Sequence, residues 1–136
     1  MICWAGSGSA GRNMAASRME RLVAKRTAER RARALRCALA AIPALKNQGI
    51  QAYVIGSLAT GRFMSHSDVD YLVTGHIGPM DRRLVEATIA GAMAGSNVGY
   101  DVVYEDDVEE DLLEEFRHAR ADAPRLLELA HQAGAA

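Results

Sequence analysis

The spacing in the sequence that most clearly indicates a chemical site is that of Asp68 and Asp70, two aspartates separated by a single residue. They begin the largely apolar stretch 68–74, which predicts a strand, and side chains two positions apart on a strand project from the same face. Two carboxylates roughly 4 Å apart repel each other by about 4 kcal/mol at an effective dielectric constant of about 20. A divalent cation such as Mg²⁺ would relieve this repulsion, because it binds carboxylate oxygens together with waters and phosphates. The pair therefore predicts a metal site.

A third acid, Asp101, lies inside another apolar stretch, residues 98–104, which also predicts a strand. An unpaired charge is costly to bury, so a carboxylate in an apolar strand indicates a specific role. If this strand lies beside the one that carries Asp68 and Asp70, the three carboxylates meet and can hold two metal ions about 3.5–4 Å apart. We therefore expect all three acids to be metal ligands.

A glycine and a serine, Gly56 and Ser57, follow the short apolar run 52–55, which predicts a buried strand entering a tight turn. Glycine lets the backbone approach a ligand closely, and a short helix that opens at the serine offers backbone N–H groups and a hydroxyl to phosphate oxygens. Arg62 can add a cation, and Ser65 or Ser67 a further hydroxyl. The sequence thus predicts that Gly56, Ser57, Arg62 and Ser67 bind phosphate beside the acids.

The same segment has the spacing of a P-loop, because Gly61 follows Gly56 after four residues. Its chemistry does not fit. Phe63 cannot bind Mg²⁺ where that motif needs a serine or threonine, and Arg62 stands in place of its lysine. The P-loop is therefore the less favoured interpretation.

Helices are expected on both sides of these strands. Residues 19–49 have helical spacing, with a break or restart predicted at Pro43 and an end at Gly49. Residues 80–94 predict a second helix. A third is expected to be capped by Asp106 or Asp107, with Glu109 or Glu110 completing a capping box, and Pro124 ends it or starts another. The order predicts an α/β domain with a small mixed sheet and flanking helices.

The length of 136 residues suits one domain. We expect a disordered leader over residues 1–13, the domain over residues 14–132 and a disordered tail over residues 133–136, with Met14 or Met19 as alternative starts. The apolar runs are shorter than the roughly 18–20 residues that cross a bilayer, and the N-terminus lacks the pattern of a secretion signal. A cytoplasmic protein without a membrane partner is therefore expected. Cys3 and Cys37 indicate neither a zinc site nor a disulfide framework.

The charges are unevenly distributed. Residues 18–46 contain nine Lys and Arg against two Glu, whereas all nine charged residues of 101–115 are acidic. This asymmetry either steers an anionic substrate or a charged partner, or reflects two solvated helix faces that lie near each other. Nucleic acid is not the expected partner, because no aromatic residues are interleaved with the basic ones.

Three parts of the sequence together resemble the signature of the DNA polymerase beta type nucleotidyltransferase superfamily. They are Gly56-Ser57-Leu58-Ala59-Thr60-Gly61, then Ser67-Asp68-Val69-Asp70, and Asp101 in a later strand. The most similar branch is the minimal nucleotidyltransferases, small prokaryotic proteins often paired with HEPN proteins as toxin–antitoxin systems. The resemblance covers residues 53–104, less than half of the chain, and its glycine–serine and Asp-x-Asp parts are specific only in combination.

This resemblance implies transfer of a nucleoside monophosphate from an NTP, usually ATP, to a hydroxyl. Asp68 and Asp70 would hold two Mg²⁺ ions, and Asp101 would complete the second metal site and help deprotonate the attacking hydroxyl. Gly56 and Ser57 would hold the triphosphate. In the minimal branch the acceptor is a tyrosine of the partner HEPN toxin, which the modification silences.

One position departs from the pattern, since many relatives carry arginine where this chain has Thr60. Phosphate binding then depends on Arg62 or is weaker. A non-catalytic antitoxin that neutralises its partner by contact is the alternative, because it would tolerate this loss. Transfer to a small molecule is less favoured, since little chain remains to bind such an acceptor. Homo-oligomers and hetero-oligomers both stay open.

Overall fold

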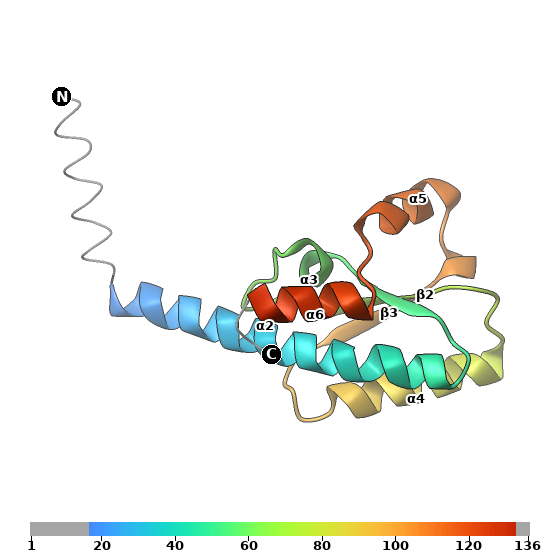
Figure 1. The fold of residues 1–136 in the computed structure, drawn as a ribbon, viewed down its shortest axis with the longest axis horizontal. Coiled ribbons are helices and arrows are strands. Elements are labelled where there is room, and N and C mark those ends of the chain that lie inside the picture. The colour runs from blue at the N-terminus through green and yellow to red at the C-terminus, as the bar shows by residue number, and fades with distance from the viewer. Residues whose placement is uncertain (1–16, 133–136) are drawn as a thin grey trace.

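The computed structural model describes residues 17–132, which form a three-stranded sheet with helices on both sides (Figure 1). The strand order is β1-β2-β3, with β1 antiparallel to β2 and β2 parallel to β3. This confirms the predicted small mixed sheet with flanking helices. The elements are α2 (Arg18–Asn47), β1 (Ala52–Ile55), α3 (Ser57–Thr60), β2 (Val69–Val73), α4 (Pro79–Met93), β3 (Tyr100–Tyr104), the 3₁₀ turn η1 (Glu105–Asp107), α5 (Glu110–Ala119) and α6 (Ala123–Gln132).

Helix α2 has a polar cap at each end. At its start the Ser17 side chain accepts the backbone N–H of Glu20 at 3.0 Å, which satisfies one of the free donors of the first turn. At its end the N–H of Gly49 donates to Lys46 O and that of Ile50 to Leu45 O. Gly49 has a positive φ of 80°, so this is the Schellman arrangement that glycine favours, and the predicted end at Gly49 is confirmed.

The predicted break at Pro43 is wrong, because α2 continues through it to Asn47. Proline inside a helix removes one backbone hydrogen bond and typically costs about 3 kcal/mol. Here Pro43 lies on the exposed side, while Ile42 and Leu45 on the inner side are buried in the core. The packing of this inner side against the rest of the core offsets the lost bond.

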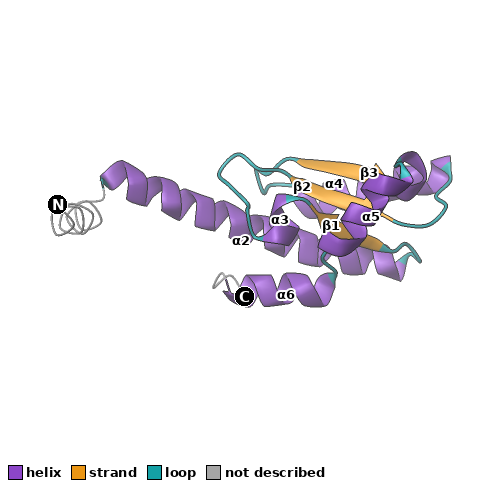
Figure 2. Cartoon of the chain, turned by 90° about the horizontal axis from the view of Figure 1, so that it is seen from above, coloured by secondary structure: helices purple, strands orange, loops and turns teal. Residues whose placement is uncertain are grey.

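The two faces of the sheet are covered differently (Figure 2). Buried side chains of α2, α4 and α6 form the main core with one face of the sheet, to which the strands contribute Val54, Val69, Tyr71 and Val73. The other face carries a smaller cluster, in which Ile55 and Leu72 pack with Leu113 of α5. The sheet therefore has one fully packed face and one face that α5 covers only in part.

The acidic residues after β3 do not cap a helix as predicted. Asp106 and Asp107 belong to η1, where Asp106 contacts His76 at 2.7 Å and Asp107 accepts from Arg82 at 2.8 Å. Helix α5 begins at Glu110, and its N-cap residue makes no side-chain cap hydrogen bond. The 3₁₀ turn directs Asp106 to His76, in the segment between β2 and α4, and Asp107 to Arg82 of α4, so neither is available as a cap.

Pro124 lies in the first turn of α6, so it starts a new helix rather than only ending α5. Asp122 supports this start, since its side chain accepts the N–H of Arg125 at 3.0 Å. Among residues 17–132 we find no helix with the length and apolar character needed to cross a bilayer. The leader predicted over residues 1–13 and the tail predicted over residues 133–136 lie outside the described residues.

Candidate functional site

The carboxylate pair at the centre of the site comes from two neighbouring strands. Asp70 of β2 is paired in register with Asp101 of β3. Because side chains on adjacent parallel strands at the same register share a face, the two carboxylates lie side by side. The flanking Val69 and Tyr71 are fully buried in the main core, so the two acids project from the opposite, partly open face. The predicted adjacency of the two strands is confirmed.

Asp68 joins this pair from the loop just before β2. The ladder continues one residue beyond the strands, where the N–H of Val69 donates to the carbonyl of Gly99 at 2.9 Å. The Asp68 carboxylate lies directly over Gly99, since a Cβ on that glycine would be 2.6 Å from Asp68 Oδ1. Gly99 is two residues before Asp101 and shares its face. All three acids are therefore on one side of the sheet, at one end.

The electrostatics of Asp70 reflect this crowding. The pKa of its carboxyl is raised above its ordinary value, first because the group is partly buried and then because Asp101 and Asp68 repel its charged form. A carboxylate whose ionisation is opposed by two like charges is stabilised by any nearby cation. The site therefore favours binding of positive charge between the acids.

Gly56 lies directly against the carboxylate of Asp70. Gly56 has φ of 75° and ψ of −152°, a conformation almost restricted to glycine, and a Cβ there would be 2.6 Å from Asp70 Oδ2. Ser57 opens the short helix α3, as predicted. The hydroxyl of Thr60 donates to the carbonyl of Gly56 at 3.2 Å and helps to close this turn. The glycine–serine turn therefore begins beside Asp70, one of the three acids.

The two remaining predicted binding residues are placed differently from each other. Arg62 is exposed in the loop after α3, and its guanidinium has no hydrogen-bond or ion-pair partner within residues 17–132. Ser67 is engaged in the loop itself, since its hydroxyl accepts the N–H of Met64 at 2.9 Å. Arg62 is therefore available to a ligand, whereas the hydroxyl of Ser67 holds the loop that precedes Asp68.

A residue that the sequence analysis did not single out, Arg30 of α2, connects these pieces. Its guanidinium donates to the carbonyl of Ser67 at 2.9 and 3.2 Å and to the carbonyl of Asn97 at 2.9 Å. It also lies 3.8 Å from Asp68 Oδ1. Arg30 therefore ties together the loops that lead into β2 and β3. It belongs to a basic helix and is distant in sequence from both loops, so no local pattern pointed to this positioning role.

The acids fit Mg²⁺ in chemistry but do not form a complete cage. Within residues 17–132 no three His, Cys, Asp or Glu side chains are already arranged as a ready ligand set. Mg²⁺ is usually bound by one or two carboxylates, with waters and substrate phosphates completing its octahedron. Three carboxylates on one face of the sheet, two of them resting against glycines that leave room for their oxygens, suit this mode of binding. Asp68, Asp70 and Asp101 are thus the residues that could hold the ion.

Comparison with known proteins adds no assignment to this geometry. Neither the models of known protein families nor the curated proteins contain a match to this chain.

Proposed function

We propose that this chain is a metal-dependent nucleotidyltransferase of the minimal nucleotidyltransferase kind, acting in the cytoplasm. It transfers AMP from ATP to a protein hydroxyl, a tyrosine of a partner HEPN toxin, and acts as the antitoxin of that pair. The observation that supports this most directly is the register of Asp70 with Asp101, on the face where Gly56 and Asp68 also lie. The partner and the acceptor tyrosine rest on the resemblance of the motifs.

In the proposed reaction the acceptor oxygen forms a bond to the α-phosphorus of ATP, the bond to the β-phosphate oxygen breaks, and pyrophosphate leaves. Asp101 takes the proton of the attacking hydroxyl. Gly56, Ser57 and Arg62 bind the triphosphate, the glycine by close approach and the arginine by its free charge. Bound Mg²⁺ supplies neutralisation of the charge that develops on the phosphate oxygens. Asp68 and Asp70 would hold the ion through their carboxylate oxygens.

Labelled ATP tests the proposal. The chain is incubated with α-labelled ATP, Mg²⁺ and the product of the neighbouring gene, and the label on that protein is followed with time. Asp70→Asn should slow transfer by at least about 10²-fold, because losing several kcal/mol of charge stabilisation costs about tenfold in rate for each 1.4 kcal/mol. Asp81→Asn is the matched control, since Asp81 is an exposed acid of α4, and should label at the wild-type rate. Equal labelling by wild type and Asp70→Asn would refute the assignment.

A second function, neutralisation of the partner by contact alone, is favoured by exposed apolar residues on the first half of α2. The exposed fraction is 67% for Met19 and 48% for Val23. In that case a variant with alanine at Asp68, Asp70 and Asp101 would still protect cells from the partner toxin. Loss of protection in a variant that still co-purifies with the partner would exclude contact as sufficient.

A further inference from the structure

The first half of α2 extends beyond the rest of the molecule (Figure 1). Residues 17–29 are exposed except for Thr27, whereas from Ala34 onward one side of the helix is buried in the core. The side that faces the core later in the helix continues into this free half as Met19, Val23 and Thr27. A helical stretch of this length gains little stability without packing, so an apolar side left open indicates a surface that a partner covers.

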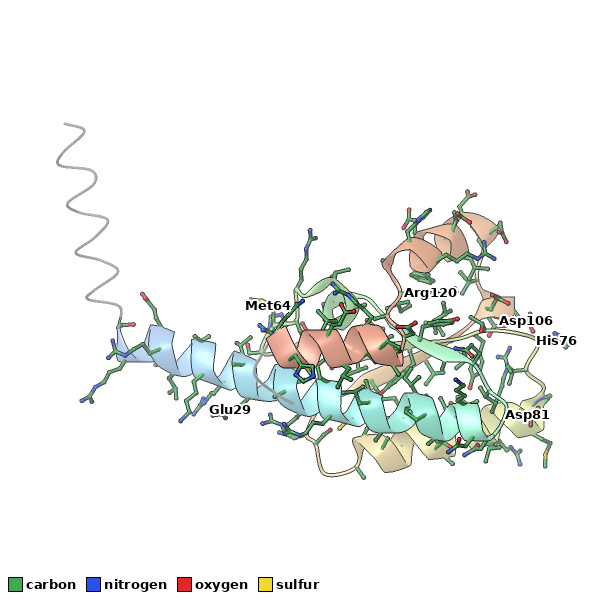
Figure 3. The ribbon with its side chains drawn as sticks, in the orientation of Figure 1. Glu29, Met64, His76, Asp81, Asp106 and Arg120 are labelled. Atoms are coloured by element: carbon green, nitrogen blue, oxygen red, sulfur yellow. The ribbon has the colours of Figure 1, made fainter. Side chains whose placement is uncertain are left out.

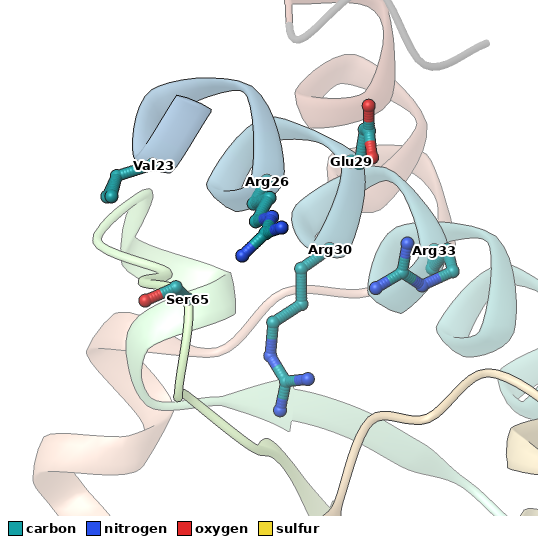
Figure 4. A pocket seen from close by; sticks show the side chains of 6 residues that line it. All are labelled: Val23, Arg26, Glu29, Arg30, Arg33 and Ser65. Atoms are coloured by element: carbon teal, nitrogen blue, oxygen red, sulfur yellow. The ribbon is translucent and has the colours of Figure 1, made fainter. Parts of the chain in front are cut away.

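Two cavities line this half of the helix and share Val23. One, of about 460 Å³, lies between α2 and the loop residue Ser65 and is lined by Arg26, Arg30 and Arg33 (Figure 4). The other, of about 500 Å³, lies between α2 and Met64 and is also lined by Met19, Glu20, Ala24, Thr27 and Arg31. Met64 also lies near this helix in Figure 3, far from His76 and Asp106 at the other end of the molecule. We call the two cavities together the α2 groove.

The groove is apolar along one side and basic along the other. Arg26, Arg30 and Arg33 share one side of the helix, at spacings where like charges repel. Arg30 and Arg33 are partly satisfied by loop carbonyls, at Ser67 and Asn97 for Arg30 and at Ser96 for Arg33. A carboxylate-bearing partner would complement this surplus of positive charge.

The groove also continues into the proposed active site. Arg30 lines it and lies 3.8 Å from Asp68 Oδ1, so the basic side of the groove ends where the acidic cluster begins. A segment bound along α2 would therefore place a residue at one of its ends beside the acids. This continuity with the acids distinguishes the α2 groove from an apolar patch that has no relation to the proposed active site.

Other occupants fit less well. The same α2 segment of a second copy carries the same surplus of arginine, so two such segments would repel each other. The chain's own acidic helix, α5, lies at the other end of the molecule (Figure 1), and its Glu110 and Glu114 are bonded to Arg117. A nucleic acid would be expected to find aromatic side chains for stacking, and the cavity-lining residues include none, while Glu29 lies among the arginines.

We propose that the α2 groove binds an acidic, amphipathic segment of the acceptor protein and so presents that protein's hydroxyl to Asp101. The role in presenting the acceptor rests on the proposed function; the binding itself does not. Apolar side chains of the segment fill the space beside Met19, Val23 and Met64, and its carboxylates face Arg26 and Arg31. The structure thereby assigns the acceptor a chemical character that the motifs leave open.

Peptide binding to the full-length chain tests this inference without ATP. The probe is a fluorescein-labelled peptide of about 15 residues, with leucines at helical spacing, glutamates between them and one tyrosine near an end, since Met19 to Arg31 spans about 18 Å. A lysine-for-glutamate counterpart and a single-stranded RNA of similar length are measured in parallel by fluorescence anisotropy. We expect the acidic peptide to bind most tightly and to weaken as salt rises.

Single substitutions then locate the binding surface. Arg26→Glu and Val23→Asp should each weaken binding of the acidic peptide by about tenfold. Arg26→Glu reverses a charge that faces the peptide's carboxylates, and Val23→Asp places a negative charge on the apolar side of the groove. Both residues are exposed, so the fold should persist, which circular dichroism checks. Arg83→Glu is the matched control, because it makes the same charge change on an exposed residue of α4, and should change binding less than about twofold.

The outcomes separate this inference from the proposed function. Equal effects of Arg26→Glu and Arg83→Glu, no binding of the acidic peptide, or tighter binding of the lysine peptide or the RNA would each overturn the inference. A third outcome is that peptide binding depends on Arg26 and Val23, while Asp70→Asn does not change the labelling of the neighbouring gene's product. This result would support the groove as a docking surface and refute the proposed enzymatic function.

Discussion

Two neighbouring residues of β2, Asp70 and Tyr71, project from opposite faces of the sheet and have different roles. Tyr71 points into the main core, is fully buried and directs its hydroxyl to Met93 Sδ at 3.3 Å. Asp70, one residue earlier, projects from the other face toward Asp101 and Asp68. Burial raises the pKa of both side chains. Only for Asp70 does repulsion by neighbouring carboxylates raise the pKa further, and a bound cation would offset that repulsion.

The comparison shows how a three-stranded sheet can carry a charged cluster. The packed face provides the apolar burial that stabilises the fold, so the partly open face is free to hold three acids that repel one another. Substitutions on the packed face should therefore change stability, whereas those on the open face should change binding and pH dependence.

The largest effect is expected at Tyr71. Tyr71→Ala should lower the free energy of unfolding by about 3–5 kcal/mol, as for other large buried aromatic side chains, because it leaves a cavity in the main core. Tyr53→Ala is the control on the open face, where the ring is only partly buried and the Arg120 Cζ lies 4.0 Å from its centroid. It should lower the free energy of unfolding less than Tyr71→Ala does, by about 1 kcal/mol for the lost cation–π contact plus the contribution of the smaller buried area. Urea unfolding followed by circular dichroism measures both, and equal losses of stability would contradict the division between the packed face and the open face.

An intermediate effect is expected at Gly56. Gly56→Ala combines a backbone conformation costly for alanine, about 1–3 kcal/mol, with a Cβ that displaces the Asp70 carboxylate. Gly61→Ala is the matched control, because its φ is also positive, at 78°, but its Cβ would meet no atom within 4 Å. Both variants should lose stability in urea unfolding, and only Gly56→Ala should also lose Mg²⁺ binding measured by calorimetry. Equal Mg²⁺ binding by the two variants would show that the glycine does not support the acid.

The smallest effect is the pH dependence contributed by Asp70. Because its folded-state pKa is raised above the ordinary 3.8, the folded protein binds more protons than the unfolded chain between the two values. The stability that this carboxyl contributes is therefore present below the unfolded pKa and is lost as pH rises through the folded pKa.

Asp70→Asn removes this dependence. With EDTA present, the variant should gain stability relative to wild type as pH rises from below 3.8 to neutrality, as measured by urea unfolding at each pH. Asp81→Asn, which removes an exposed acid of α4, is measured alongside as the control. A stability difference between Asp70→Asn and wild type that does not change with pH would contradict the electrostatic account of the site.

Much of the local structure could be predicted from the sequence. The strand over residues 52–55 has the predicted bounds, and the strands predicted over residues 68–74 and 98–104 are present as the shorter β2 and β3. The helix predicted over residues 80–94 is α4, shifted by one residue at each end. The errors at Pro43 and at Asp106 and Asp107 share a cause, since in each case contacts with residues distant in sequence overrode a local preference.

The sequence alone determined which side chains share a face of each strand, because alternation along an extended backbone is a local property with a period of two residues. That was enough to separate Asp68 and Asp70 from Val69 and Tyr71. Only the tertiary structure decided that β3 lies parallel to β2 with Asp101 opposite Asp70, and that Arg30 reaches both loops. Strand register and such long-range contacts depend on how helices pack over the sheet, which no short stretch of sequence encodes.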